Sequence, residues 1–246
     1  MKRSGCTISA SKVVPDTSNA YSPTLEAICV RLIEAYTVEN WWPADSQFEV
    51  LVGAILVQNT RWVNVAKAVD RLREHRCLDP LSLSRTKQTD LQEWIRSAGC
   101  QSVKARRLHS LAAWVVESGG LEALELMPTS DLRSALLKVH GIGEETADAI
   151  LCFGFSRRVF VADQYARTWL SRTGLVPESA ARRYASCRDI VEPALTATTI
   201  CMQGLHAAIV MHAQSVCRRE PECDRCVLAK RCSFACGSTV ARDIRC

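Results

Sequence analysis

The stretch that most constrains the fold of this chain is residues 139–147 (VHGIGEETA), a turn between two segments with helical patterning. Gly141 and Gly143 permit backbone angles that a side chain forbids, and they keep side-chain bulk out of the turn. The N–H groups of such a loop, together with the N-terminus of the helix that follows, are suited to binding an anion such as a phosphate. A short apolar run then presents one carboxylate, Asp163, eighteen positions beyond Glu145. A G-x-G turn alone occurs in many proteins, so its meaning depends on the rest of the chain.

Helical periodicity extends along most of the sequence. Apolar residues recur at helical spacing, and no segment shows the alternation that predicts a strand. Residues 46–58 begin with a Ser46 cap and are then apolar on every side, which is typical of a helix at the centre of a bundle. We therefore predict an all-α protein, with helices at residues 24–36, 46–58, 61–75, 89–97, 102–118, 121–126, from Thr129 or Ser130 toward Val139, and at 163–173, 178–192 and 197–213.

Length and composition set broad limits. With 246 residues, 48% of them hydrophobic, the chain can hold one large domain or two modest ones. No run approaches about eighteen uninterrupted apolar residues, so we expect no membrane-spanning helix and no membrane partner. Residues 1–22 lack an apolar stretch of signal-peptide length, and we expect a disordered tail on a monomeric, cytoplasmic protein, nucleoid-associated if bacterial. The net charge of +5 permits nucleic-acid binding without demonstrating it.

The thirteen cysteines are not distributed as a disulfide framework would be. Four of them give the spacing C-x5-C-x2-C-x5-C near the C-terminus, namely Cys217, Cys223, Cys226 and Cys232. Four thiolates within sixteen residues can enclose one inorganic centre, and such sites hold zinc or an iron–sulfur cluster. The spacing alone does not choose between these two. In a chain without a secretion signal, the pattern favours a reduced compartment and a metal site over disulfides.

The glycine turn, Asp163 and the four cysteines occur in an order that resembles the endonuclease III-like DNA glycosylases of the helix-hairpin-helix (HhH-GPD) superfamily. The resemblance covers about residues 25–232 and also includes Gln58, in the segment VQNT, and the run VAD that ends at Asp163. In that family the cysteines hold a [4Fe–4S] cluster, whereas zinc is the alternative that the spacing leaves open. The first interval between the cysteines is five residues here and usually six in the family, so this loop is slightly shortened.

The resemblance implies two all-α domains. Residues 46–154 would form a six-helix domain that ends in the helix-hairpin-helix. Residues 23–45 and 155–232 would form the second domain with the iron–sulfur loop, and residues 233–246 a tail. The implied partner is double-stranded DNA containing a damaged base.

The resemblance also assigns roles at the DNA. Gly141, Ile142 and Gly143 would contact the DNA backbone, and Gln58 would fill the gap that a flipped base leaves. A solvent-exposed glutamine at the end of a helix explains Gln58 equally well. By position, Asp163 matches the family's catalytic aspartate, which stabilises positive charge on the deoxyribose and positions or deprotonates the attacking water. Without the motif, Asp163 would be read as the cap of the helix at 163–173.

Enzymes of this family that also cut the DNA strand carry a lysine where this chain has Glu145. That lysine forms a Schiff base with the sugar, which requires an amine. We therefore predict a monofunctional glycosylase without AP lyase activity, since nothing in the spacing makes Lys104 or Lys138 a substitute. The simplest role of Glu144 and Glu145 is favourable charge in the first turn of a helix.

The segments around Trp42 and Trp62 resemble a bacterial subgroup of 3-methyladenine glycosylases that also has Glu at the lyase position. The implied pocket stacks an alkylated, electron-poor purine on aromatic rings, and Trp42 and Trp62 are the candidates for that pocket. Core packing is the alternative for either tryptophan. Other functions consistent with the sequence are a mismatch uracil or thymine glycosylase, an endonuclease III-type glycosylase and AP lyase, and a helix-hairpin-helix module that binds DNA without catalysis.

Overall fold

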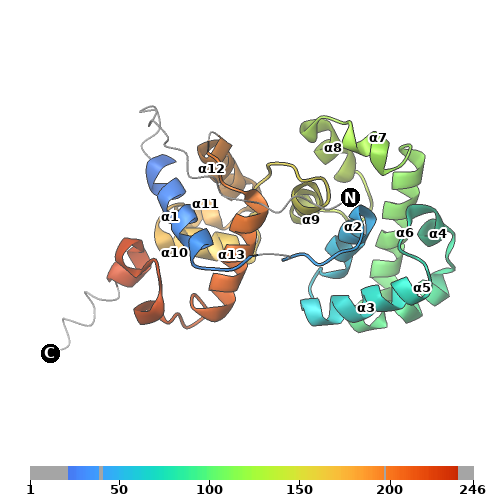
Figure 1. Cartoon of the computed structure of the whole chain (residues 1–246), viewed down its shortest axis with the longest axis horizontal. Coiled ribbons are helices and arrows are strands. Elements are labelled where there is room, and N and C mark those ends of the chain that lie inside the picture. Colours follow the sequence, from blue (N-terminus) through green and yellow to red (C-terminus); the bar gives the residue numbers. More distant parts are fainter. Residues whose placement is uncertain (1–21, 39–40, 197, 238–246) are drawn as a thin grey trace. The chain divides into compact units, whose positions relative to one another are not determined.

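The computed structural model describes residues 22–38, 41–196 and 198–237 (Figure 1). Within these ranges the chain is helical and contains no strand, which confirms the all-α prediction. No helix there has both the length and the apolar composition needed to cross a bilayer. The predicted N-terminal tail lies outside the described residues except for Ser22, which begins a helix. Residues 233–237 form a helical turn where the sequence predicted the start of the C-terminal tail.

The chain divides into two compact units. Unit 1 contains Met1–Trp41 and Arg158–Cys246, and unit 2 contains Trp42–Arg157. Each unit therefore has its own set of packed helices and is described separately.

Unit 2 carries the glycine turn. Its helical elements are α2 (Gln47–Leu56), α3 (Trp62–Glu74), α4 (Pro80–Arg85), α5 (Gln88–Trp94), the 3-10 turn η1 (Arg96–Ala98), α6 (Gln101–Glu117), α7 (Leu121–Glu125), α8 (Thr129–Leu136), α9 (Glu144–Ala149) and the π-helical turn η2 (Ile150–Gly154). Helix α2 is buried from Phe48 to Leu56 and packs against α3, α6, α9 and η2. Its central position follows from its apolar composition on every side, as predicted.

Unit 1 carries Asp163 and the four-cysteine loop. Its helices are α1 (Ser22–Glu34), α10 (Gln164–Thr173), α11 (Glu178–Ala181), α12 (Tyr184–Thr196), α13 (Met202–Ser215) and the 3-10 turns η3 (Cys223–Arg225) and η4 (Ala229–Arg231). Helix α13 packs against both α1 and α10, so two segments far apart in sequence share one core. Trp169 of α10 is among the largest fully buried side chains of that core.

Several helices differ from the prediction in their existence, bounds or cap. Helix α4 was missed because it is only six residues long, although Asp79 caps it and Pro80 occupies its first turn. The helix predicted at 178–192 is divided into α11 and α12, and the one predicted at 197–213 begins only at Met202. Helix α8 follows Pro128, so neither Thr129 nor Ser130 is its cap.

Candidate DNA-binding turn, aspartate and cysteine site

The glycine turn joins α8 to α9, as the sequence predicted. Gly141 has a φ of +87°, in the left-handed region that favours glycine. Gly143 precedes α9 with ordinary extended angles, and its carbonyl accepts the amide of Ala147 at 2.9 Å. Ile142 is buried and anchors the turn to the core of unit 2, so only its backbone is available to a ligand. The bend of the turn therefore requires a glycine at position 141.

Gln58 and Arg107 hold the turn from the side of α2 and α6. The Gln58 amide nitrogen donates to the carbonyl of Gly141 at 3.1 Å and to the hydroxyl of Thr146 at 2.9 Å. Arg107 in turn donates to the Gln58 amide oxygen. A Cβ atom on Gly141 would overlap the side chain of Arg107, so this close approach also requires glycine. The structure thus gives Gln58 a positioning contact that the sequence did not predict.

A second connection joins the two helices of the turn. Arg133 of α8 donates to both carboxylate oxygens of Asp148, from Nε at 2.7 Å and from Nη2 at 3.1 Å. Asp148 is fully buried, and the paired carboxylate is the main cause of a raised pKa for Arg133. A buried, bidentate pair of this kind fixes orientation as well as charge. Sequence reasoning missed it because residues fifteen positions apart on two short helices give no periodic signal.

The position of the lyase lysine lies in the first turn of α9. Glu144 and Glu145 are both exposed there, where negative charge is favourable at a helix N-terminus. Lys104 is buried, and its Nζ donates to the carbonyls of Leu56 at 2.9 Å and Ala98 at 2.8 Å. Burial lowers the pKa of Lys104. Its amine is engaged in hydrogen bonds to the C-terminal ends of α2 and η1.

Asp163 lies at the N-terminus of α10, after a run of buried residues at 159–162. Its Oδ1 accepts the amide hydrogen of Ala166 at 2.8 Å, so Asp163 is the cap of this helix. In the described part of the chain, no hydrogen bond reaches the other carboxylate oxygen. Asp163 is half-buried, and the backbone of α10 fixes one of its two carboxylate oxygens.

The two tryptophans predicted for the base pocket lie together in unit 2. The ring centroids of Trp42 and Trp62 are 5.2 Å apart in an edge-to-face arrangement. The ring centroids of Trp42 and Phe153 are 4.9 Å apart. Phe153 belongs to η2 and was not among the predicted pocket residues. Gly53 of α2 leaves room for this packing, because a Cβ atom there would lie 3.2 Å from Nε1 of Trp42. Both tryptophans remain partly exposed, which leaves aromatic surface for a ligand.

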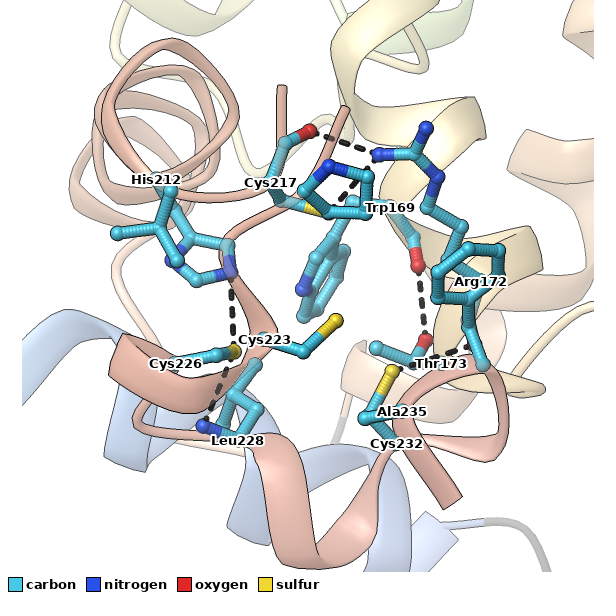
Figure 2. Close-up of a pocket in the computed structure, with 13 residues that line it drawn as sticks. Trp169, Arg172, Thr173, His212, Cys217, Cys223, Cys226, Leu228, Cys232 and Ala235 are labelled. Carbon is cyan, nitrogen blue, oxygen red and sulfur yellow. Dashed lines mark hydrogen bonds between the residues drawn. The ribbon is translucent and has the colours of Figure 1, made fainter. Parts of the chain in front are cut away.

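The four predicted cysteine ligands line one hollow in unit 1 (Figure 2). The hollow measures about 350 Å³ with its mouth included. Arg172 of α10 donates to the Sγ atom of Cys217 at 3.3 Å, and the amide of Leu228 donates to the Sγ atom of Cys226 at 3.4 Å. No disulfide joins the four cysteines, which are available as thiols.

The electrostatic environment of the hollow is set mainly by burial. Burial raises the pKa of the Cys226 thiol, the hydrogen bond from the Leu228 amide partly offsets this, and the other three cysteines raise the pKa further. Burial also lowers the pKa of His212 to about 4, so this imidazole is neutral at neutral pH. The indole Nε1 of Trp169, another residue of the lining, is buried and has no hydrogen-bond partner in the described part of the chain.

The hollow fits an iron–sulfur cluster by donor chemistry. Four thiols from one loop line it, and N–H donors reach two of the sulfur atoms. The indole N–H of Trp169 finds no acceptor among the residues that the structure describes. Among the residues that the structure describes, no three His, Cys, Asp or Glu side chains are close enough to hold a metal ion.

Comparison with known proteins defines the class. A family model described as HhH-GPD superfamily base excision DNA repair protein matches residues 52–193. Over 206 residues the chain is 37% identical to a protein of Methanocaldococcus jannaschii whose name assigns it provisionally to the DNA repair glycosylases, covering 82% of this chain and 92% of that protein. The chain belongs to the HhH-GPD superfamily and is a base excision repair DNA glycosylase, like the endonuclease III-type enzymes.

Two solved structures share this fold. The H. pylori 3-methyladenine DNA glycosylase MagIII, bound to 1,N6-ethenoadenine, is 27% identical with a TM-score of 0.67, over 78% of this chain and 97% of that one. Endonuclease III in a non-covalent DNA complex is 17% identical with a TM-score of 0.74, over 89% of this chain and 98% of that one. The predicted superfamily and all-helical fold are therefore confirmed, while the base specificity stays a prediction.

Proposed function

We propose that this glycosylase is monofunctional and removes an alkylated purine, such as 3-methyladenine, from duplex DNA. The observation that carries the substrate assignment is the aromatic cluster of Trp42, Trp62 and Phe153. A methylated purine is electron-poor or cationic, and it binds favourably against the electron-rich faces of tryptophan. The 27% identity to an enzyme named for 3-methyladenine supports the same substrate class.

We propose Asp163 as the catalytic carboxylate. A glycosylase takes the base out of the stack before it breaks the glycosidic bond, and that step leaves positive charge on the deoxyribose. A fixed negative charge stabilises this charge electrostatically, and it orients or deprotonates the attacking water. The hydrogen bond from the amide of Ala166 fixes Oδ1, which leaves Oδ2 for the water or the sugar.

The absence of lyase activity follows from the residue at position 145. An exposed carboxylate in the first turn of α9 cannot form the Schiff base that strand cleavage requires. Lys104 is not a replacement, because its ammonium group is buried and bound to two carbonyls. The product of the proposed reaction is a free base and an intact strand with an abasic site.

We propose that the turn around Gly141, Ile142 and Gly143 contacts a DNA phosphate through backbone N–H groups. Such contacts fix the position of the protein on DNA without reading sequence. Gln58 is proposed to fill the gap left by the flipped base. Its amide now bonds Gly141 and Thr146, so insertion into DNA would exchange these bonds for contacts with bases.

We propose that Cys217, Cys223, Cys226 and Cys232 hold a [4Fe–4S] cluster rather than zinc. The support is that all four cysteines line one hollow, that N–H groups donate to two of their sulfur atoms, and that the motif resembles the cluster loop of the endonuclease III-like family. When bound, such a cluster cross-links the loop and brings a redox-active group to it. The exposed basic residues of the loop, Arg218, Arg219, Arg225, Lys230 and Arg231, would then form a stable surface for phosphates.

A base-release assay tests the substrate assignment. The protein is incubated with duplex DNA containing 3-methyladenine, uracil opposite guanine, or thymine glycol, and the released base is identified by chromatography. We expect release of 3-methyladenine at the highest rate. Release of uracil alone would instead indicate a mismatch glycosylase. This activity is the second candidate because a thymine/uracil-DNA glycosylase of Methanothermobacter thermautotrophicus is 22% identical over 79% of this chain. Release of only thymine glycol would indicate an enzyme for oxidised pyrimidines.

A further inference from the structure

The cysteine hollow contains a buried donor that the described protein leaves without an acceptor. Trp169 is 1% exposed, and its indole Nε1 has no hydrogen-bond partner in the part of the chain that the structure describes. An indole N–H can only donate, so the missing partner must be an acceptor. Figure 2 draws the Trp169 side chain as part of the lining that also includes the four cysteines.

A second N–H group reaches the hollow from α13. Nε2 of His212 lies 3.6 Å from Sγ of Cys226, and Nδ1 of the same ring lies 2.8 Å from the hydroxyl of Tyr36. His212 is 1% exposed, so these two contacts determine where its proton resides. A ligating cysteine is a thiolate and can only accept, which places the proton on Nε2. The Tyr36 hydroxyl then donates to Nδ1 and fixes this tautomer.

We propose that Trp169 and His212 donate hydrogen bonds to the sulfur atoms of the cluster and its ligands, and that Tyr36 positions His212 for this role. This inference rests on the proposed [4Fe–4S] cofactor. The two donors come from α10 and α13, and Tyr36 follows α1, so three separate elements of unit 1 contribute to the surroundings of the cluster. Side chains outside the C-x5-C-x2-C-x5-C motif would therefore influence the reduction potential of the cluster.

The expected consequence is a change in reduction potential. Hydrogen bonds to sulfur stabilise negative charge, and the reduced cluster carries one more negative charge than the oxidised one. Each N–H donor therefore raises the reduction potential. Removing a donor shifts the potential to more negative values without removing a ligand.

The test compares three purified variants with the full-length wild type. Trp169→Phe removes the indole N–H and keeps an aromatic ring in the core. Tyr36→Phe removes one hydroxyl and leaves His212 in place. Trp94→Phe is the matched control, because Trp94 lies in unit 2 and stacks on His75 with the ring centroids 4.0 Å apart. Iron content, visible absorbance per iron and the midpoint potential from a redox titration are measured for each protein.

We expect Trp169→Phe and Tyr36→Phe to keep the iron content of the wild type and to shift its potential to more negative values. The shift should be smaller for Tyr36→Phe, because this variant removes only the hydrogen bond that favours one tautomer of His212 and keeps the imidazole itself. Trp94→Phe should have the potential of the wild type. Iron-containing variants with unchanged potentials would overturn the donor assignment and leave the cofactor in place. A wild-type protein without iron would overturn the cofactor and the donor assignment together.

Discussion

Asp163 combines a structural and a chemical role in one carboxylate. Its Oδ1 caps α10, and a capping aspartate is ordinarily replaced by asparagine at little cost because both accept the same backbone hydrogen bond. The negative charge, in contrast, is available only from the aspartate. One substitution therefore separates the two roles.

We predict that Asp163→Asn folds with nearly the stability of the wild type and binds duplex DNA, but releases base about 100- to 1,000-fold more slowly. The matched control is Asp79→Asn, because Asp79 caps α4 through the same contact, to the amide of Ser82 at 2.9 Å. Single-turnover base release and thermal denaturation of both variants provide the measurement. Equal rates for Asp163→Asn and the wild type would exclude Asp163 as the catalytic group.

At the scale of elements, the turn between α8 and α9 depends on one of its glycines far more than on the other. Gly141 has a φ of +87° and lies against Arg107, whereas a Cβ atom on Gly143 would meet nothing within 4 Å. A side chain in the left-handed region costs about 1–2 kcal/mol, before any clash is added. The two glycines of the motif therefore have different physical roles.

We predict that Gly141→Ala lowers the free energy of unfolding by at least about 1 kcal/mol and weakens DNA binding, because the turn must move away from Arg107. Gly143→Ala should cost less, about 1 kcal/mol or below, since it only replaces glycine at a helix cap. Urea denaturation and DNA affinity measured on both variants test this ordering. A larger loss for Gly143→Ala would show that the turn is held differently.

The pair of Arg133 and Asp148 joins the two helices of the turn, and its carboxylate partner is fully buried. Removing one partner of a buried ion pair leaves an uncompensated charge, so we predict that Arg133→Met lowers the free energy of unfolding by about 3 kcal/mol or more. The control is Arg182→Met, which breaks an exposed pair with Glu178 and should cost about 0–1 kcal/mol. Chemical denaturation distinguishes these values, and equal losses would contradict the structural role of the buried pair.

For the whole molecule, sequence patterns predicted the features that depend on residues close together along the chain. Apolar periodicity predicted the helices and the central position of α2, and the G-x-G motif predicted the turn. The spacing of the cysteines predicted that all four surround one metal centre; the four do line one hollow, while the metal stays a prediction. In each case one short segment contains the whole signal.

The contacts that hold the site were not predicted, because they join residues that are distant in sequence. Gln58 and Gly141 are 83 positions apart, and Tyr36 and His212 are 176 positions apart. Phe153 was missed for a related reason, since an apolar residue in a buried run gives no sign that it stacks on Trp42. Packing between elements, rather than local pattern, decides these positions.

The most direct test of the proposed chemistry is the state of the DNA strand after a damaged base has been released. An end-labelled duplex with a single alkylated adenine is incubated with the protein, and half of each sample is treated with alkali before electrophoresis. We predict strand breaks only in the alkali-treated half, together with no covalent complex on addition of borohydride, because Glu145 provides no amine. Strand breaks without alkali, accompanied by a borohydride-trapped complex, would contradict the assignment of a monofunctional glycosylase.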